Sequence, residues 1–253
     1  MSQRVLITAA ASGIGLEIAR AFSLAGARVC VTDMSEPALD RAQTEIPGLL
    51  ALRCDHAQRA DIETMVPAAV QALGGLDVLV NNAGIAGPTA PVHEVEPDDW
   101  DAVINVNLTG TFHVTRLAIP HLKASGSGSI IVMSSLAGRF GYPNRSPYCA
   151  SKWALVGFTK TLSIELGGDN IRANAIAPGA VGGQRMENVL AGRAAVAGTS
   201  VEEARDSMLG IQSIKRFVDP KDIAALCVFL ASDAARSISG QVIPIDNDAQ
   251  KTS

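Results

Sequence analysis

The stretch "RVLITAAASGIGLEIARAFSLAG" (residues 4–26) decides the fold, because it joins three signals in order. It begins with a short apolar run, "RVLITA" (4–9), typical of a buried strand, and ends with "GLEIARAFSLAG" (15–26), which has helical periodicity. Between them lies the glycine-containing segment "TAAASGIG" (8–15). A plain turn would join a strand to a helix in the same way, but such a loop can also bring free N–H groups at the helix start against a phosphate.

The rest of the chain repeats this alternation. Further apolar runs are typical of strands covered on both faces, at 27–33, 48–55, 76–84, 128–135, 171–179 and 241–246. Helix-period stretches separate them, at 61–73, 98–122, 151–166 and 219–232. Strands that alternate with helices form parallel βαβ units. We therefore expect an α/β fold: a Rossmann-type doubly wound parallel sheet in a three-layer α/β/α sandwich, with ligands beyond the carboxyl ends of the strands.

Composition and charge narrow the class of protein. The 253 residues are 47% hydrophobic and 18% charged, and no linker or repeat divides them, so we expect a single domain over 1–253. The net charge of −4 argues against a nucleic-acid or membrane partner. The start "MSQRVLITAA" has no signal-peptide layout, and Cys30, Cys54, Cys149 and Cys227 show no metal-ligand spacing. We expect a cytoplasmic protein with free thiols and no bound metal.

Asp33, at the end of the second predicted strand, favours one dinucleotide. A carboxylate at this point can accept hydrogen bonds from the adenosine ribose hydroxyls and would repel a 2′-phosphate. No cation follows it closely, so we predict NAD rather than NADP, although Asp33 could instead cap a helix that begins near Glu36. The loop residues expected to contact the cofactor are Thr8, Ser12, Gly13, Ile14 and Gly15.

Small polar residues follow the next two predicted strands. Asp55 could hydrogen-bond the adenine. Asn82, Ala83 and Gly84 would let the chain run close to the adenine ribose. The same residue types favour turns, so turn chemistry alone is an alternative interpretation.

A tyrosine and a lysine stand four residues apart in "SPYCASKW" (146–153). In a helix Tyr148 and Lys152 share one face, as an ordinary surface pair or as a chemical unit. A free tyrosine has a pKa near 10, too high for a base at neutral pH. An ammonium about 4 Å away is worth at most about 4 kcal/mol at an effective dielectric of 20, which would lower the pKa of the phenol by up to roughly three.

A family resemblance connects these signals. The motifs that carry it are "TAAASGIG" (8–15), "NNAG" (81–84), "VNLTG" (106–110), "MSS" (133–135) and "YCASK" (148–152). In this order, from about residue 4 to about residue 246, the chain resembles the short-chain dehydrogenase/reductase family. The resemblance implies an NAD(P)-dependent oxidoreductase that interconverts a secondary alcohol and a ketone by hydride transfer.

The resemblance also assigns catalytic roles. Tyr148 would take the hydroxyl proton, and Lys152 would lower the pKa of Tyr148 and bind the nicotinamide ribose. Ser135 would hydrogen-bond the substrate oxygen. Asn107 would orient a water that joins Lys152 to solvent, a role that explains a poor helix former inside a predicted helix.

The chain departs from the family pattern in three places. Ala9 replaces the first loop glycine, which costs free energy if that position needs positive φ. Gly183 stands where the family commonly has a threonine that touches the nicotinamide amide, and the usual "DGG" near the end is "DND" (246–248). The residues left to hold the carboxamide, mainly through the backbone, are Pro178, Gly179 and Val181.

The family places the substrate pocket between residues 85–95, 136–147 and a mobile lid at about 180–212. Three arginines in these walls are candidate substrate contacts: Arg139, Arg145 and Arg185. An arginine that faces the pocket could hold a carboxylate bidentately, whereas one that faces solvent or another subunit would not. We expect a small polar hydroxy acid or a sugar-derived alcohol as substrate.

Two other functions stay open. A 3-oxoacyl-(acyl carrier protein) reductase is the nearest, but members of that group tend to place cations near the positions of Ser129 and Asp169, and neither residue is basic. A catalytically idle, dinucleotide-sensing binding protein is the other, yet all four catalytic residues are present. Helices expected at 98–122 and 147–166 carry apolar residues on more than one face, which, with the family resemblance, predicts a homotetramer.

Overall fold

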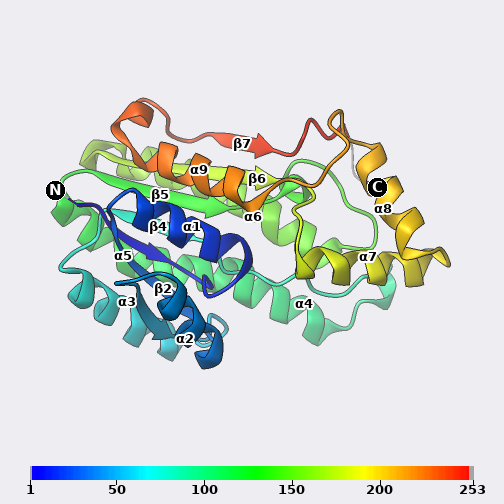
Figure 1. Cartoon of the computed structure of the whole chain (residues 1–253), viewed down its shortest axis with the longest axis horizontal. Helices are drawn as coiled ribbons and strands as arrows, with labels where there is room; N and C mark the ends of the chain where they lie inside the picture. Colours follow the sequence, from blue (N-terminus) through cyan, green and yellow to red (C-terminus); the bar gives the residue numbers. More distant parts are fainter. Residues whose placement is uncertain (1, 251–253) are drawn as a thin grey trace.

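A seven-stranded parallel sheet forms the centre of the fold, in the order β3-β2-β1-β4-β5-β6-β7 (Figure 1). The computed structural model describes residues 2–250, with the side chain of Arg185 left out. The strands are β1 (Arg4–Ile7), β2 (Arg28–Asp33), β3 (Leu50–Arg53), β4 (Val78–Asn81), β5 (Gly128–Met133), β6 (Ile171–Pro178) and β7 (Val242–Ile245). All neighbouring pairs in this order run parallel, so the predicted doubly wound sheet is confirmed.

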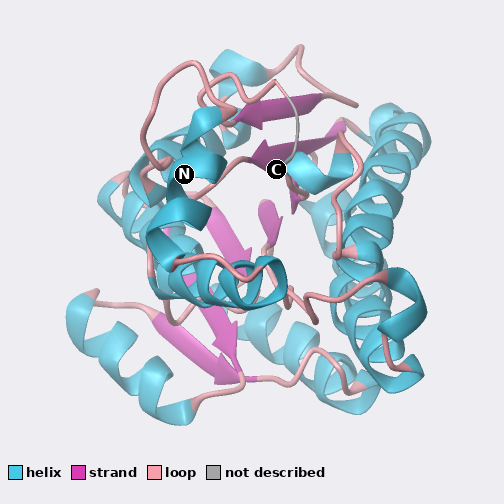
Figure 2. Cartoon of the chain, turned by 90° about the vertical axis from the view of Figure 1, so that its right-hand side faces the viewer, coloured by secondary structure: helices cyan, strands magenta, loops and turns pink. Residues whose placement is uncertain are grey.

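Helices cover both faces of the sheet and complete the predicted three layers (Figure 2). On one face lie α1 (Gly13–Leu24), α2 (Glu36–Glu45) and α9 (Pro220–Ala231). On the other lie α3 (Arg59–Leu73), α5 (Thr111–Ser125) and α6 (Ser146–Leu166). Two separate apolar cores, one on each side of the sheet, hold the layers together.

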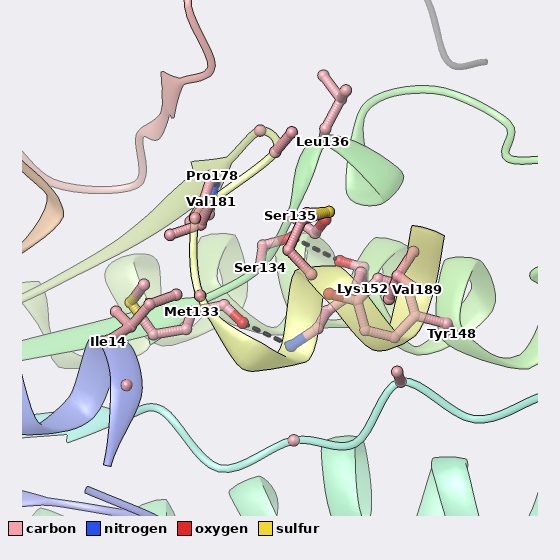
Figure 3. Close-up of a pocket in the computed structure, with 18 of the residues that line it drawn as sticks. Ile14, Met133, Ser134, Ser135, Leu136, Tyr148, Lys152, Pro178, Val181 and Val189 are labelled. Atoms are coloured by element: carbon pink, nitrogen blue, oxygen red, sulfur yellow. Dashed lines mark hydrogen bonds between the residues drawn. The ribbon is translucent and has the colours of Figure 1, made fainter. Parts of the chain in front are cut away.

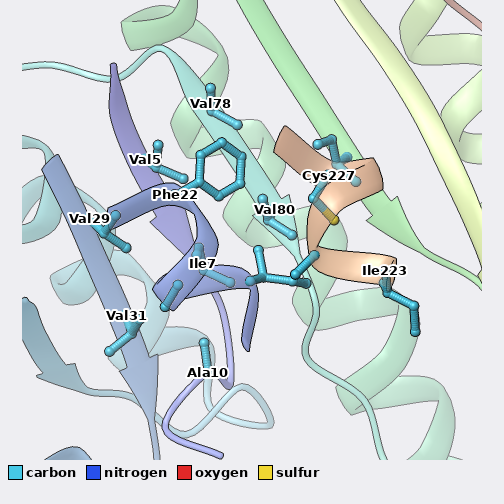
Figure 4. Close-up of a cluster of buried hydrophobic side chains, with 14 of the residues drawn as sticks. Val5, Ile7, Ala10, Phe22, Val29, Val31, Val78, Val80, Ile223 and Cys227 are labelled. Atoms are coloured by element: carbon cyan, nitrogen blue, oxygen red, sulfur yellow. The ribbon is translucent and has the colours of Figure 1, made fainter. Parts of the chain in front are cut away.

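Successive side chains of a strand point to opposite faces, which explains how one sheet contributes to two cores. Val5 and Ile7 of β1 pack with Phe22 of α1 on one face (Figure 4), while Leu6 between them belongs to the opposite core. An uninterrupted apolar run must therefore be covered on both faces. The side chains of these four residues are fully buried. Their packing fixes the position of β1 in the sheet and of the loop that follows it.

The helix predicted at 98–122 is divided. It begins as α4 (Pro97–Ile104), passes through a π-helical segment, η2 (Asn105–Gly110), and continues as α5 to Ser125. A π-helical turn changes which side chains share a face. Here it accompanies two tertiary contacts, the side chain of Asn105 on the Ala57 carbonyl and the side chain of Asn107 on the backbone of Ile85.

The segment expected to be a mobile lid contains two helices, α7 (Gln184–Ala197) and α8 (Val201–Gly210). They share a small apolar core of their own, built around Leu190, Ala194 and Met208. Ser200 begins α8 with a capping box, in which Glu203 supplies the return hydrogen bond. Within residues 2–250, no helix combines the length and the apolar character that crossing a membrane requires.

Candidate active site

A cavity of about 520 Å³ opens at the carboxyl ends of β1, β4, β5 and β6. The order of strands reverses between β1 and β4, and ligands of open α/β sheets bind at such a switch point. Most of the predicted site residues line this cavity: Ser12, Gly13, Ile14, Gly15, Asp33, Asn82, Gly84, Ser135, Arg145, Tyr148, Lys152, Pro178, Gly179 and Val181. Figure 3 shows how those from β5, α6 and the loop after β6 converge.

The loop between β1 and α1 contains two glycines whose backbone positions a larger residue would strain. Gly13 has φ of +56°, and a Cβ on Gly15 would lie 2.6 Å from the Cα of Ala10, so neither position accommodates a larger residue without strain. Ala9 has φ of +48°, so the alanine that replaces the family's glycine occupies the left-handed region. The free N–H groups of the first turn of α1 follow at once.

Asp33 stands beside this loop at the end of β2. Its carboxylate accepts hydrogen bonds from the backbone N–H of Ala11 at 3.3 Å and of Ser35 at 3.1 Å. Ser35, not Asp33, is the N-cap residue of α2, so the alternative of Asp33 as that helix cap is wrong. The carboxylate is thus held at the cavity wall, next to the loop between β1 and α1.

Thr8 and Asn82 join the ends of β1 and β4. The hydroxyl of Thr8 accepts from the backbone N–H groups of Asn82 and Ala83, both at 3.0 Å, and the Asn82 amide donates to the Ala9 carbonyl at 2.8 Å. Thr8 and Ala83 are buried and lie behind the cavity surface. Asp55 also lies outside the lining, where its carboxylate accepts from the backbone N–H of Ala57.

Tyr148 and Lys152 lie one turn apart on α6, and both line the cavity. Lys152 is 4% exposed, and its Nζ donates to the carbonyl oxygen of Met133 at 2.8 Å, at the end of β5. The ammonium lies 5.6 Å from the centroid of the Tyr148 ring (Figure 3). The helix therefore brings the phenol and the cation to one cavity, as their spacing predicts.

The two serines after β5 have opposite surroundings. Ser134 is buried, and its hydroxyl donates to the carbonyl oxygen of Lys152 at 2.9 Å, which ties the strand end to α6. Ser135 caps the turn η3 (Leu136–Gly138), accepting from the Ala137 N–H. A Cβ on Gly138 would lie 2.7 Å from the carbonyl oxygen of Lys152, so η3 approaches α6 as closely as its backbone allows.

Asn107 is fully buried in the π-helical segment, behind the cavity. Its amide oxygen accepts from the Ile85 N–H at 2.7 Å, and its amide nitrogen donates to the Ile85 carbonyl and to the Ser151 hydroxyl, both at 3.1 Å. A Cβ placed on Gly84 would lie 3.2 Å from the Asn107 oxygen and 3.4 Å from the Lys152 Nζ. The Asn107 oxygen and the Lys152 Nζ therefore both border the space that a side chain at position 84 would occupy.

The predicted arginines have different positions. Arg145 is buried at the cavity wall, donates to the Ala86 carbonyl at 2.8 Å and to the Thr89 hydroxyl at 3.2 Å, and lies 5.2 Å from the Tyr148 ring centroid. Arg139 does not line the cavity, because its guanidinium binds the Asp246 carboxylate at 2.7 Å. The side chain of Arg185 lies outside the described residues.

Tyr142 was not among the predicted site residues, yet its side chain lines the cavity. It lies within the wall expected at 136–147, and the chain has only two tyrosines, so an aromatic hydroxyl in that segment was the available signal. Burial raises the pKa of Tyr142, while the nearby guanidinium groups of Arg193 and Arg145 oppose that shift.

The buried thiols and His56 do not form a second reactive centre. Burial raises the pKa of Cys30 and of Cys54 to about 12 and also raises that of Cys227, which keeps these thiols protonated. Burial also lowers the pKa of His56 to about 4. Among the described residues, no group of three or more His, Cys, Asp and Glu side chains could hold a metal ion.

Comparisons with known proteins agree with the fold and with the motifs. A family model described as enoyl-(acyl carrier protein) reductase matches residues 8–247. The 3-oxoacyl-(acyl carrier protein) reductase of Thermotoga maritima is 40% identical over 245 residues, 95% of each chain. The D-beta-hydroxybutyrate dehydrogenase of Cupriavidus necator is 38% identical over 247 residues, also 95% of each chain.

Solved structures extend this likeness to three dimensions. A variant of actinorhodin polyketide ketoreductase, solved with NADPH, has a TM-score of 0.93 and 34% identity, covering 97% of this chain and 96% of its own. The sheet, the loop after β1 and the carboxyl-end cavity define a dinucleotide-binding α/β protein. More specifically, the chain belongs to the short-chain dehydrogenase/reductase family.

Proposed function

We propose that this protein is an NAD-dependent oxidoreductase that interconverts a secondary alcohol and a ketone by hydride transfer. One observation carries the proposal: Tyr148 and Lys152 line the same cavity as the loop before α1 and the carboxylate of Asp33. A proton-transfer group and a dinucleotide cradle within one cavity are what the oxidation of a CH–OH group requires.

The cavity fits a dinucleotide. Gly13 and Ile14, at the start of α1, would hold the pyrophosphate, and Asp33 would bind the adenosine ribose. Backbone groups near Val181 would hold the carboxamide, since Gly183 offers no side chain. One structurally similar ketoreductase was solved with NADPH. Family membership alone therefore does not decide between NAD and NADP. The proposal of NAD therefore depends on Asp33, whose negative charge opposes a 2′-phosphate.

When bound, NAD supplies the acceptor for the hydride that leaves the carbinol carbon. Tyr148, as the phenolate, takes the hydroxyl proton of the substrate in the same step, and the C–O bond becomes a carbonyl. The ammonium of Lys152 would favour the phenolate form of Tyr148, because a nearby positive charge stabilises a negative one. Ser135 donates a hydrogen bond to the substrate oxygen. Asn107 holds its place behind Gly84 and orients a water beside Lys152.

We propose a small polar hydroxy acid or a sugar-derived alcohol as substrate. A buried guanidinium, that of Arg145, lies at the cavity wall beside Tyr148, where a carboxylate could reach it. The relative named D-beta-hydroxybutyrate dehydrogenase supports a hydroxy acid.

The 40% identical 3-oxoacyl-(acyl carrier protein) reductase supports the alternative of a ketoacyl substrate. Ser129, one of the two positions at which such reductases tend to carry a cation, is buried in β5 and therefore forms no part of a docking surface. The other residue, Asp169, pairs with Lys123.

We also propose a homotetramer. Large apolar side chains are exposed on the helices predicted to form its interface: Trp100, Phe112, Trp153 and Ile164. Solvent-exposed apolar groups of this size on consecutive helices favour burial against another copy of the chain.

The test is a screen of alcohols with NAD and with NADP, followed through the absorbance of the reduced cofactor. Turnover of small hydroxy acids or polyols with NAD is the expected result. Turnover confined to acyl thioesters would favour the ketoacyl alternative. Cofactor binding without turnover of any alcohol or ketone would overturn the proposed reaction in favour of a sensing protein.

A further inference from the structure

Two tyrosines and two arginines are grouped on one side of the cavity: Tyr142, Arg145, Tyr148 and Arg193. Tyr142, Arg145 and Tyr148 line the cavity and come from the segment that leads into α6 or from its first turn. Arg193 comes from α7, and its guanidinium lies 4.6 Å from the centroid of the Tyr142 ring. The group therefore joins the catalytic helix to the lid.

The electrostatics of this group favour an anion. Burial raises the pKa of Tyr142, so its phenol remains a neutral hydrogen-bond donor near pH 7, while Arg193 and Arg145 both impose positive charge on it. Arg145 is held in place by its hydrogen bonds to Ala86 and Thr89. Its side chain therefore loses little conformational entropy when a ligand binds. A fixed cation, a second cation and a phenolic donor suit a carboxylate.

A second cavity of about 340 Å³ adjoins the first at this point. It shares Gly84, Ala86, Arg145 and Val189 with the catalytic cavity and is also lined by Thr89 and Asn188. Arg145 thus stands at the junction of the two. There is room beyond the reacting centre for the end of a short substrate that carries a polar group.

We propose that Tyr142 and Arg145 bind the carboxylate of the substrate, with Arg193 positioning Tyr142, so that the protein acts on short-chain hydroxy acids and their oxo acids. This inference rests on the proposed function and selects one of its substrate classes. Arg145 and Tyr148 are three residues apart at the start of α6, and such neighbours have Cβ atoms about 5–6 Å apart. The carboxylate and the carbinol carbon must therefore be separated by only a few bonds. Arg193 acts as a positioning residue, because from α7 it holds the ring of Tyr142 at the cavity wall.

The experiment compares a four-carbon 3-hydroxy acid with its primary amide, which has nearly the same shape but no charge. The wild-type kcat/KM with NAD is expected to favour the acid by roughly tenfold to hundredfold, the range for charge-assisted hydrogen bonds. R193M and Y142F are expected to lose most of that preference through a higher KM for the acid, with turnover of the amide little changed. R193K, which keeps the charge, should retain part of it.

Arg205 supplies a matched control. It is also a lid arginine above an aromatic ring, 5.5 Å from the centroid of Phe217, and it pairs with Glu187 away from the cavity lining. R205M is expected to leave the ratio of acid to amide unchanged.

The outcomes separate the two proposals. If R193M and Y142F lower kcat/KM equally for the acid and for the amide, both residues have only a structural role and the inference is overturned. Turnover of neutral alcohols without preference for the acid would also overturn it, while the proposed reaction would stand. If NAD binds and no alcohol is oxidised, the reaction itself is wrong, and the inference is wrong with it.

Discussion

The ammonium of Lys152 lies 5.6 Å from the ring centroid of Tyr148, and its Nζ donates to the Met133 carbonyl at the end of β5. The hydrogen bond to the end of β5 fixes the position of the ammonium beside the phenol. Spacing along α6 brings the two side chains to one face, and the bond to β5 sets the position of that face over the cavity.

Removal of this cation should change the pH dependence of the reaction. In K152M the pKa of Tyr148 is expected to rise toward that of a free tyrosine, near 10. The phenolate is the active form, so the rising limb of kcat/KM should shift to higher pH, with a loss of about a hundredfold or more at pH 7. K160M is the control: Lys160 lies on the same helix, exposed, with its Nζ on the Gly240 carbonyl. An unshifted limb in K152M would show that Lys152 does not set the acidity of the base.

Asp33 should determine the choice of cofactor. D33N removes the charge that opposes a 2′-phosphate and weakens the acceptors for the ribose hydroxyls, so the ratio of kcat/KM for NAD to that for NADP is expected to fall about tenfold or more. D40N, at an exposed position of α2, should leave the ratio unchanged. A wild-type preference for NADP, or an unchanged ratio in D33N, would contradict the role given to Asp33.

Replacement of the strained Ala9, in the loop between β1 and α1, should stabilise the protein. Ala9 has φ of +48°, a conformation that glycine adopts without cost, so A9G is expected to raise the free energy of unfolding by about 1 kcal/mol. For a chain of this size that corresponds to about 2–4 °C in Tm. G13A, at φ of +56°, should have the opposite effect. Thermal unfolding measures both, and a lower Tm in A9G would show that Ala9 is not strained.

The exposed apolar residues on α6 should matter for assembly. Ile164 is 83% exposed, and I164E would place a charge in the proposed interface, so light scattering should show a smaller species than the wild type. Leu24, 84% exposed on α1, is the control, because no interface is proposed there. A wild-type monomer at micromolar concentration, or a larger effect of L24E than of I164E, would count against the tetramer.

The apolar patterns of the sequence predicted the three layers of the fold but not the interruption of the helix expected at 98–122. The run that contains Val5, Leu6 and Ile7 indicated a strand buried on both faces, and the structure confirms it. The π-helical turn at 105–110 was not predicted, because it depends on contacts with Ala57 and Ile85, far away in the sequence.

Side-chain directions in the site were harder to predict than positions. Arg139 and Arg145 fall in one predicted wall, yet Arg139 turns to Asp246, 107 residues away, and only the fold brings that carboxylate near. Ser134 and Ser135 likewise have opposite surroundings for reasons of tertiary packing.

The most direct test of the central claim is Y148F, assayed for oxidation of the alcohol that the wild type uses best and, separately, for binding of NAD. The variant keeps the ring and loses only the hydroxyl that exchanges the proton. We predict a loss of turnover of about a hundredfold to ten-thousandfold with the Kd for NAD nearly unchanged. Turnover close to that of the wild type would contradict the account.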